Sequence, residues 1–341
     1  MIKILELFGG IGAPRKAMLN LGYPHKAIDY VEIDEKSVRT YNALYEHIHQ
    51  PQSVVGWNLK PDILVHGSPC QDFSRAGTRL GGNDEDKTRS SLMWETIRII
   101  ENMGVWKPQV VIWENVKGVL AKDMIHNFKK YFVEMERLGY TSNYEVLDSR
   151  EFGIPQKRER VFVISMLNGH WFDFSTLKGR PMKDVQELLE TNVDDKYTIK
   201  SPSMLKAINK RKGFGGGLKP IEDYSWTITT KQNRCPNSGI VSIGNGKYRL
   251  LTELECWRLM GFDDDDFYKV ANEHPTRRNT TNGTLYKQAG NSIVVQVLEA
   301  IFEEVLKVIK EETICRQSNT HVSQLQSWNK NATITSNNVM N

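Results

Sequence analysis

Residues 2–14 read IKILELFGGIGAP, and this stretch decides the fold class. The run from Ile2 to Phe8 has the length and the β-branched content of a buried parallel strand. A glycine-rich turn follows from Gly9 to Pro14, and helical spacing begins between Ala17 and Leu21. A strand that leads through small residues into a helix predicts an α/β unit with a ligand site at the helix N-terminus.

Similar units continue along the chain. Short apolar runs predict four more strands, at Lys26–Val31, Ile63–His66, Val110–Trp113 and Val161–Met166. Segments with helical spacing, such as residues 92–103, lie between them. Strands that alternate with helices predict βαβ units, so we expect an α/β fold with a doubly wound, mostly parallel sheet. In such a sheet the chemistry lies in the loops beyond the carboxyl ends of the strands.

The composition excludes several classes of protein. The chain has 341 residues, of which 39% are hydrophobic and 25% are charged, so it is neither a disulfide-stapled mini-protein nor a disordered chain. Its four cysteines are far apart and form no CxxC pair, so we expect no metal site and no disulfide framework. The four aspartates at 263–266 are expected to form a solvated loop.

The sequence predicts no membrane association. The first residues, MIKILELFGG, lack the charged leader and the continuous apolar stretch of a signal peptide. No window approaches the ~20 apolar residues of a membrane span. We therefore expect a cytoplasmic protein.

Cys70 is the most informative residue, because it follows the strand at 63–66 and is preceded by Ser68 and Pro69. A thiol exposed at the functional edge of the sheet acts as a nucleophile if its pKa is lowered. The alternative is a small buried hydrophobe, which is the usual role of a free cysteine. Its position favours the nucleophile, whereas the other three cysteines keep the structural interpretation.

Charged residues follow two further strands. Glu114 comes directly after four apolar residues, so burial should raise its pKa and make it a proton donor near neutral pH. The alternative for Glu114 is a solvated or ion-paired acid. Arg158 and Arg160 alternate after Pro155 and either bind a phosphate or a base carbonyl or belong to a solvated charged loop.

The glycine-rich turn and Glu32 together predict a nucleoside-containing cofactor. Glu32 lies at the end of the second strand, about 20 residues after the turn, and its carboxylate suits a ribose diol. An ordinary tight turn followed by a surface acid is the alternative interpretation.

Five short motifs follow one another along the chain: Phe8-Gly9-Gly10-Ile11-Gly12, Gly67-Ser68-Pro69-Cys70-Gln71, Glu114-Asn115-Val116, Gln156-Lys157-Arg158-Glu159-Arg160 and Gln288-Ala289-Gly290-Asn291-Ser292. Taken in this order, they strongly resemble those of the cytosine-5 DNA methyltransferases of bacteria and phages. A further match, Arg249-Leu-Leu-Thr252-x-x-Glu255-x-x-Arg258-Leu-Met-Gly261-Phe262, resembles the block that follows the target-recognition domain in that family.

The resemblance implies a DNA (cytosine-5)-methyltransferase that flips a target cytosine out of duplex DNA. By position, the Cys70 thiolate adds to carbon 6, and a methyl group passes from S-adenosylmethionine to carbon 5. Glu114 then holds ring nitrogen 3 and the amino group, and Arg160 holds the O2 carbonyl. Arg158 helps to position the Cys70 loop or a phosphate.

The resemblance also implies the cofactor contacts. One position departs from the family, because the acid that meets the adenine amino group is replaced by Trp57 or Asn58. The matching S-adenosylmethionine contacts are Phe8, Gly9, Gly10, Ile11, Gly12, Glu32, Ile33, Pro69, Asn291 and Ser292.

Contacts to DNA are expected in two regions. Residues 71–82 resemble the family's mobile loop, and a basic window lies between Lys200 and Arg234. That window has eight basic and two acidic residues, a net charge of +6, whereas the whole chain carries only +4. A solvated loop is the alternative for its basic clusters. The expected DNA-binding residues are Gln71, Ser74, Arg75, Lys210, Arg211, Lys212, Lys231 and Arg234.

The resemblance implies the domain organisation of a Rossmann-like methyltransferase fold with a smaller inserted target-recognition domain. Residues 1–167 form the catalytic and cofactor-binding domain, and residues 168–284 form the target-recognition domain and hinge. Residues 285–312 form a C-terminal helix that returns to the catalytic domain, and residues 313–341 form a disordered tail.

Double-stranded DNA is the expected partner, and we expect a monomer whose cognate restriction endonuclease, in a restriction-modification system, acts separately. A tRNA cytosine-5 methyltransferase on the same scaffold is an alternative, but the Cys-Phe-Thr motif of that branch is absent. A catalytically idle DNA-binding module should have lost one of the catalytic residues. A nucleotide-dependent oxidoreductase leaves Cys70 and the basic loop unexplained.

Overall fold

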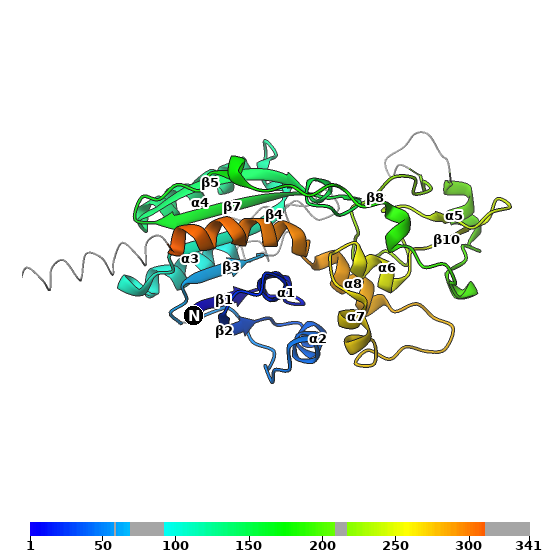
Figure 1. Ribbon diagram of the computed structural model, residues 1–341, viewed down its shortest axis with the longest axis horizontal. Coiled ribbons are helices and arrows are strands. Elements are labelled where there is room, and N and C mark those ends of the chain that lie inside the picture. Colours follow the sequence, from blue (N-terminus) through cyan, green and yellow to red (C-terminus); the bar gives the residue numbers. More distant parts are fainter. Residues whose placement is uncertain (58, 69–91, 209–216, 311–341) are drawn as a thin grey trace, which may run out of the picture.

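A computed structural model describes residues 1–57, 59–68, 92–208 and 217–310. Its centre is a six-stranded sheet of order β2-β1-β3-β4-β7-β5 (Figure 1). The first four strands in this order are parallel, and β7 is antiparallel to both of its neighbours. The strands are β1 (Ile2–Leu7), β2 (His25–Val31), β3 (Ile63–His66), β4 (Val110–Val116), β5 (Tyr140–Asp148) and β7 (Glu159–Leu167).

Helices cover both faces of this sheet, which confirms the predicted doubly wound α/β fold. One core layer joins the sheet to α1, α2, α6, α7, α8 and a C-terminal helix over residues 295–310 (orange in Figure 1), and the other joins it to α3 and α4. No helix in the described ranges is long and apolar enough to cross a membrane. The helices are α1 (Ala13–Asn20), α2 (Glu35–Tyr45), α3 (Leu92–Asn102), α4 (Ile125–Arg137), α5 (Pro202–Ala207), α6 (Glu253–Arg258), α7 (Asp264–Ala271) and α8 (Gly283–Asn291).

The segment that follows β7 is less regular. It contains α5, several single 3₁₀ turns and a small apolar cluster of Ile199, Leu218, Ile240 and Leu250. Its strand β8 pairs in parallel with β6, which precedes β7. The short strands are β6 (Gln156–Lys157), β8 (Ser225–Trp226), β9 (Val241–Ser242) and β10 (Tyr248–Arg249).

Two predictions about the C-terminal third need revision. Residues 285–310 contain most of α8 and a separate helix over residues 295–310, because the backbone is extended at Ser292 between them. The aspartates at 263–266 do not form a solvated loop. Asp263 and Asp266 form the capping box of α7, and both carboxylates bind Lys16 Nζ of α1, at 2.6 and 2.7 Å.

Arg249 and Glu255 form a buried ion pair that closes the start of α6. Two hydrogen bonds of 2.8 and 2.7 Å join the guanidinium to the carboxylate, and Glu255 is fully buried. Replacing Arg249 by Met should lower the free energy of unfolding by about 3–5 kcal/mol, because it leaves a buried charge without its partner. Urea unfolding measures this loss. Arg137→Met, which removes exposed ion pairs, should change little, and equal losses in the two variants would contradict the argument.

Candidate active site

The glycine-rich turn lies at the carboxyl end of β1, and a layer of tyrosines fixes its shape. Gly12 has a φ of 77°, and a Cβ at Gly9 would lie 2.5 Å from the Tyr30 ring. The Tyr30 hydroxyl donates to the Gly10 carbonyl at 2.6 Å, and the Tyr45 hydroxyl donates to the Gly12 carbonyl at 2.7 Å. Larger residues at Gly9 or Gly12 would therefore displace the turn.

Glu32 joins this turn to the loop after β2. Its Oε2 accepts the Gly10 amide at 3.0 Å, and its Oε1 accepts the amides of Ile33 and Asp34, each at 2.8 Å. Three amides thus fix the carboxylate, and the second lone pair of Oε2 is left for a ligand hydroxyl. The neighbouring Ile33 side chain is exposed.

A cavity opens beyond the carboxyl ends of β1, β3 and β4. It brings together residues that the sequence analysis assigned separately to cofactor binding and to catalysis. Among the residues that line it are Phe8, Gly9, Ile11, Glu114, Asn291 and Ser292.

Glu6 also lines the cavity, and the sequence analysis missed it. It is 1% exposed, its Oε1 accepts the Tyr41 hydroxyl at 3.0 Å, and its Oε2 has no hydrogen-bond partner among the residues that the structure describes. Burial raises the pKa of Glu6 to about 7. An acid inside the apolar run of residues 2–8 was the available signal.

Glu6 should make stability depend on pH. The raised pKa favours the protonated carboxyl in the folded state, so its stabilising contribution is complete below pH 4.5 and is lost as the pH rises through 7. Between pH 5 and 8 the free energy of unfolding of the wild type should fall by about 2.5 kcal/mol relative to Glu6→Gln. Urea unfolding of both proteins tests this, with the exposed Glu136→Gln as the control. A difference that stays constant with pH would contradict it.

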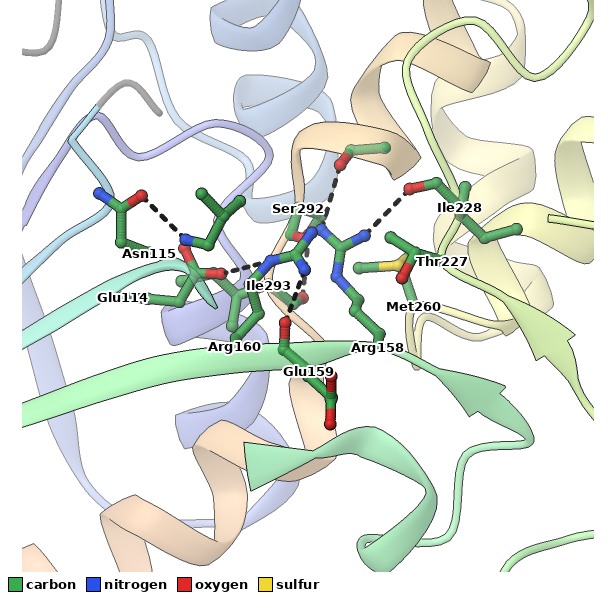
Figure 2. A network of polar contacts seen from close by, with 12 residues as sticks. Glu114, Asn115, Arg158, Glu159, Arg160, Thr227, Ile228, Met260, Ser292 and Ile293 are labelled. Carbon is green, nitrogen blue, oxygen red and sulfur yellow. Dashed lines mark hydrogen bonds and ion pairs between the residues drawn. The ribbon is translucent and has the colours of Figure 1, made fainter. Parts of the chain in front are cut away.

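Glu114 and Arg160 face each other across the antiparallel pair β4 and β7. Arg160 Nε lies 3.2 Å from Glu114 Oε1, and both side chains are mostly buried (Figure 2). Burial raises the pKa of Glu114, although the positive charges of Arg160 and Arg158 oppose the shift. The structure therefore places a carboxyl with a raised pKa beside a guanidinium at the edge of the cavity.

Arg158 is bound to backbone carbonyls from distant parts of the chain. It is 3% exposed and donates to the carbonyls of Ile228, Gly290 and Ser292, at 3.0, 3.1 and 2.8 Å (Figure 2). It is therefore not part of a solvated loop. Arg158 connects the segment after β8 to the end of α8, which carries Asn291.

Gln156 makes a second connection that the sequence analysis did not assign. It is fully buried, its Nε2 donates to the Leu259 carbonyl at 2.7 Å, and its Oε1 accepts the Ile228 amide at 2.8 Å. The Thr227 hydroxyl donates to the Lys157 carbonyl at 2.9 Å. The motif at 156–160 thus fixes parts of the segment that follows β7, at residues 227, 228 and 259, next to the sheet.

Several predicted residues lie outside the described ranges, and two others lie at the surface. Lys231 and Arg234 are exposed on a turn of the segment that follows β7. Trp57 packs against the core layer of α3 and α4, and its buried Nε1 has no hydrogen-bond partner within the described ranges. Outside the described ranges lie Asn58, Pro69, Cys70, Gln71, Ser74, Arg75, Lys210, Arg211 and Lys212.

Comparison with known proteins gives one consistent result. The sequence model of the family described as "C-5 cytosine-specific DNA methylase" matches residues 2–307. Type II methyltransferase M2.ScrFI of Lactococcus lactis subsp. cremoris is 30% identical, over 90% of this chain and 99% of its own length. Type II methyltransferase M.SsoII of Shigella sonnei is 31% identical, over 90% and 80%. The S. pombe Dnmt2 methyltransferase has a similar fold, with a TM-score of 0.71 at 20% identity, covering 91% of this chain and 99% of that one.

Proposed function

Because the chain belongs to the C-5 cytosine-specific DNA methylase family and is a DNA cytosine methyltransferase, we propose that Cys70 is its nucleophile. The thiolate adds to carbon 6 of a flipped cytosine. The electron pair then reaches carbon 5, which takes the methyl group, and the methyl donor would be left as S-adenosylhomocysteine. Loss of the carbon 5 proton to a water molecule, return of the ring nitrogen 3 proton to Glu114 and expulsion of the thiolate complete the reaction. One observation carries the proposal: Glu114, the glycine turn and Asn291 line one cavity, together with Gly67, three residues before Cys70. Arg160 pairs with Glu114 at 3.2 Å.

Glu114 and Arg160 hold the target base in this proposal. Glu114, whose pKa burial raises, donates a hydrogen bond to ring nitrogen 3 as the thiolate adds. Arg160 holds the O2 carbonyl and keeps the Glu114 carboxyl in place. Arg158 acts as a positioning residue through its three carbonyl contacts.

S-adenosylmethionine is the proposed methyl donor and supplies an electrophilic methyl group. Side chains at Gly9 or Gly12 would displace the glycine turn. Glu32 has a lone pair left for a ribose hydroxyl. In the cavity, Glu6 Oε2 has no hydrogen-bond partner among the described residues. Trp57 lies where the family has the acid that meets the adenine amino group, and its Nε1 is a donor without a hydrogen-bond partner among the described residues. The proposed contacts are Phe8, Gly9, Gly10, Ile11, Gly12, Glu32, Ile33, Pro69, Asn291 and Ser292.

Residues 168–284 form the proposed target-recognition domain and hinge. Relatives named type II methyltransferases support a role in restriction and modification, and we place a monomeric enzyme in the cytoplasm with a separate endonuclease. The proposed DNA contacts are Gln71, Ser74, Arg75, Lys210, Arg211, Lys212, Lys231 and Arg234.

The function is tested by incubating the purified chain with labelled S-adenosylmethionine and either duplex DNA or tRNA. We expect label in DNA only. Label in tRNA alone would support the tRNA alternative, and DNA binding without any transfer would support an idle module.

A further inference from the structure

Ser68 is held by both residues that flank Glu114 in the sequence. The indole Nε1 of Trp113 donates to Ser68 Oγ at 3.1 Å, and Asn115 Nδ2 donates to the Ser68 carbonyl at 3.4 Å. All three residues are almost fully buried, with exposures of 3%, 1% and 2% for Ser68, Trp113 and Asn115. Ser68 precedes Cys70 by two residues.

Alternation along β4 explains why this strand can serve two purposes. Successive side chains of a strand point to opposite faces, so Glu114 faces the cavity while Trp113 packs in the core layer of α3 and α4. Figure 2 shows that the Glu114 side chain points toward Arg160, whereas the Asn115 side chain points away from Arg160. One strand therefore fixes the carboxyl and also the start of the segment that contains the cysteine.

The Trp113 indole is fixed by aromatic neighbours. Its ring stacks on His66 with centroids 5.9 Å apart and an interplanar angle of 4°, and the Tyr131 ring lies 4.4 Å away. The Tyr131 hydroxyl is 3.2 Å from His66 Nε2. Burial lowers the pKa of His66 to about 3, so this stack contains a neutral imidazole. Packing on both sides leaves the indole N–H directed at Ser68.

We propose that Trp113 and Ser68 are positioning residues for the methyl transfer. Their hydrogen bond fixes the backbone at Ser68 relative to Glu114, which in this proposal lets the thiolate add to carbon 6 from the face of the ring while the carboxyl holds ring nitrogen 3. This inference rests on the assignment of Cys70 as the nucleophile. Removing the Ser68 hydroxyl leaves a buried indole donor without an acceptor, and small displacements of a reacting group cost large factors in rate.

The test measures single-turnover methyl transfer, because product release can hide the chemical step. Ser68→Ala and Trp113→Phe should each lower the rate roughly ten- to a hundredfold. The affinities for DNA and for S-adenosylhomocysteine should stay unchanged. The double variant should be no slower than the slower single variant, since both changes remove the same hydrogen bond. Tyr140→Phe removes a buried hydroxyl bonded to the Pro108 carbonyl, at the start of β5, and should leave the rate unchanged.

A second pair of variants covers the case in which Trp113→Phe does not fold. Ser68→Thr keeps a hydroxyl, so it should restore the rate that Ser68→Ala loses. Equal rates in wild type and Ser68→Ala, or losses that multiply in the double variant, would overturn the positioning role. An active Cys70→Ala would instead overturn the proposed nucleophile, so the two failures are distinguishable.

Discussion

Cys70→Ala should abolish methyl transfer to duplex DNA, lowering the single-turnover rate by roughly 10⁴-fold or more. Carbon 5 of cytosine is a poor nucleophile, so the reaction needs the covalent bond at carbon 6 that only a thiolate supplies. No described thiol can replace it. Burial raises the pKa of the Cys256 thiol well above its usual range, and Cys235 is exposed in the segment that follows β7.

The variant should still bind DNA, because the recognition residues are unchanged. A gel-shift titration together with single-turnover kinetics separates binding from chemistry. Cys235→Ala is the matched control, since it removes an exposed thiol distant in sequence from the motif, and its rate should equal that of the wild type. A Cys70→Ala protein that transfers methyl at the wild-type rate would contradict the assignment.

Glu114→Gln should lower the single-turnover rate by about 10²- to 10⁴-fold. Glutamine has the shape of glutamate and can donate a hydrogen bond, but it cannot give a proton to ring nitrogen 3. Burial raises the pKa of Glu114, so its protonated form persists to a higher pH than that of an exposed glutamate. The methyl-transfer rate of the wild type should therefore fall as the pH rises above the pKa of Glu114. Glu114→Gln should not show this decline.

The control for Glu114→Gln is Glu159→Gln on the neighbouring strand. The Glu159 carboxylate is 40% exposed and pairs with Lys117 at 3.3 Å, so the substitution should leave the rate near that of the wild type. Rate profiles between pH 6 and 9 test both variants. Similar losses in the two variants, or an unchanged alkaline decline in Glu114→Gln, would exclude Glu114 as the proton donor.

The strands β1, β3 and β4 could be predicted because they are mostly buried and read as short apolar runs. β5 could not, because Tyr140–Asp148 lies at the sheet edge and is largely polar. The antiparallel position of β7 depends on the chain returning through β5, a long-range property that no local pattern contains. The aspartates at 263–266 were misread because their partner, Lys16, is about 250 residues away.

The candidate site was predictable where strand ends bear chemically distinct residues. Glu114 and the glycine turn follow apolar runs, and the structure brings them into one cavity. The carbonyl contacts of Arg158 were not predictable, because the carbonyls lie 70 to 134 residues away in the sequence and no local pattern indicates them. Glu6 was hidden inside an apolar strand.

The central claim is that this chain methylates carbon 5 of cytosine in duplex DNA. The direct test exposes unmethylated duplex DNA to the purified chain and S-adenosylmethionine, digests it to nucleosides, separates the methylated products and maps their positions. We expect 5-methyldeoxycytidine alone, at one short recognition sequence, and none with Cys70→Ala. N4-methyldeoxycytidine, N6-methyldeoxyadenosine or unmodified DNA would contradict the account.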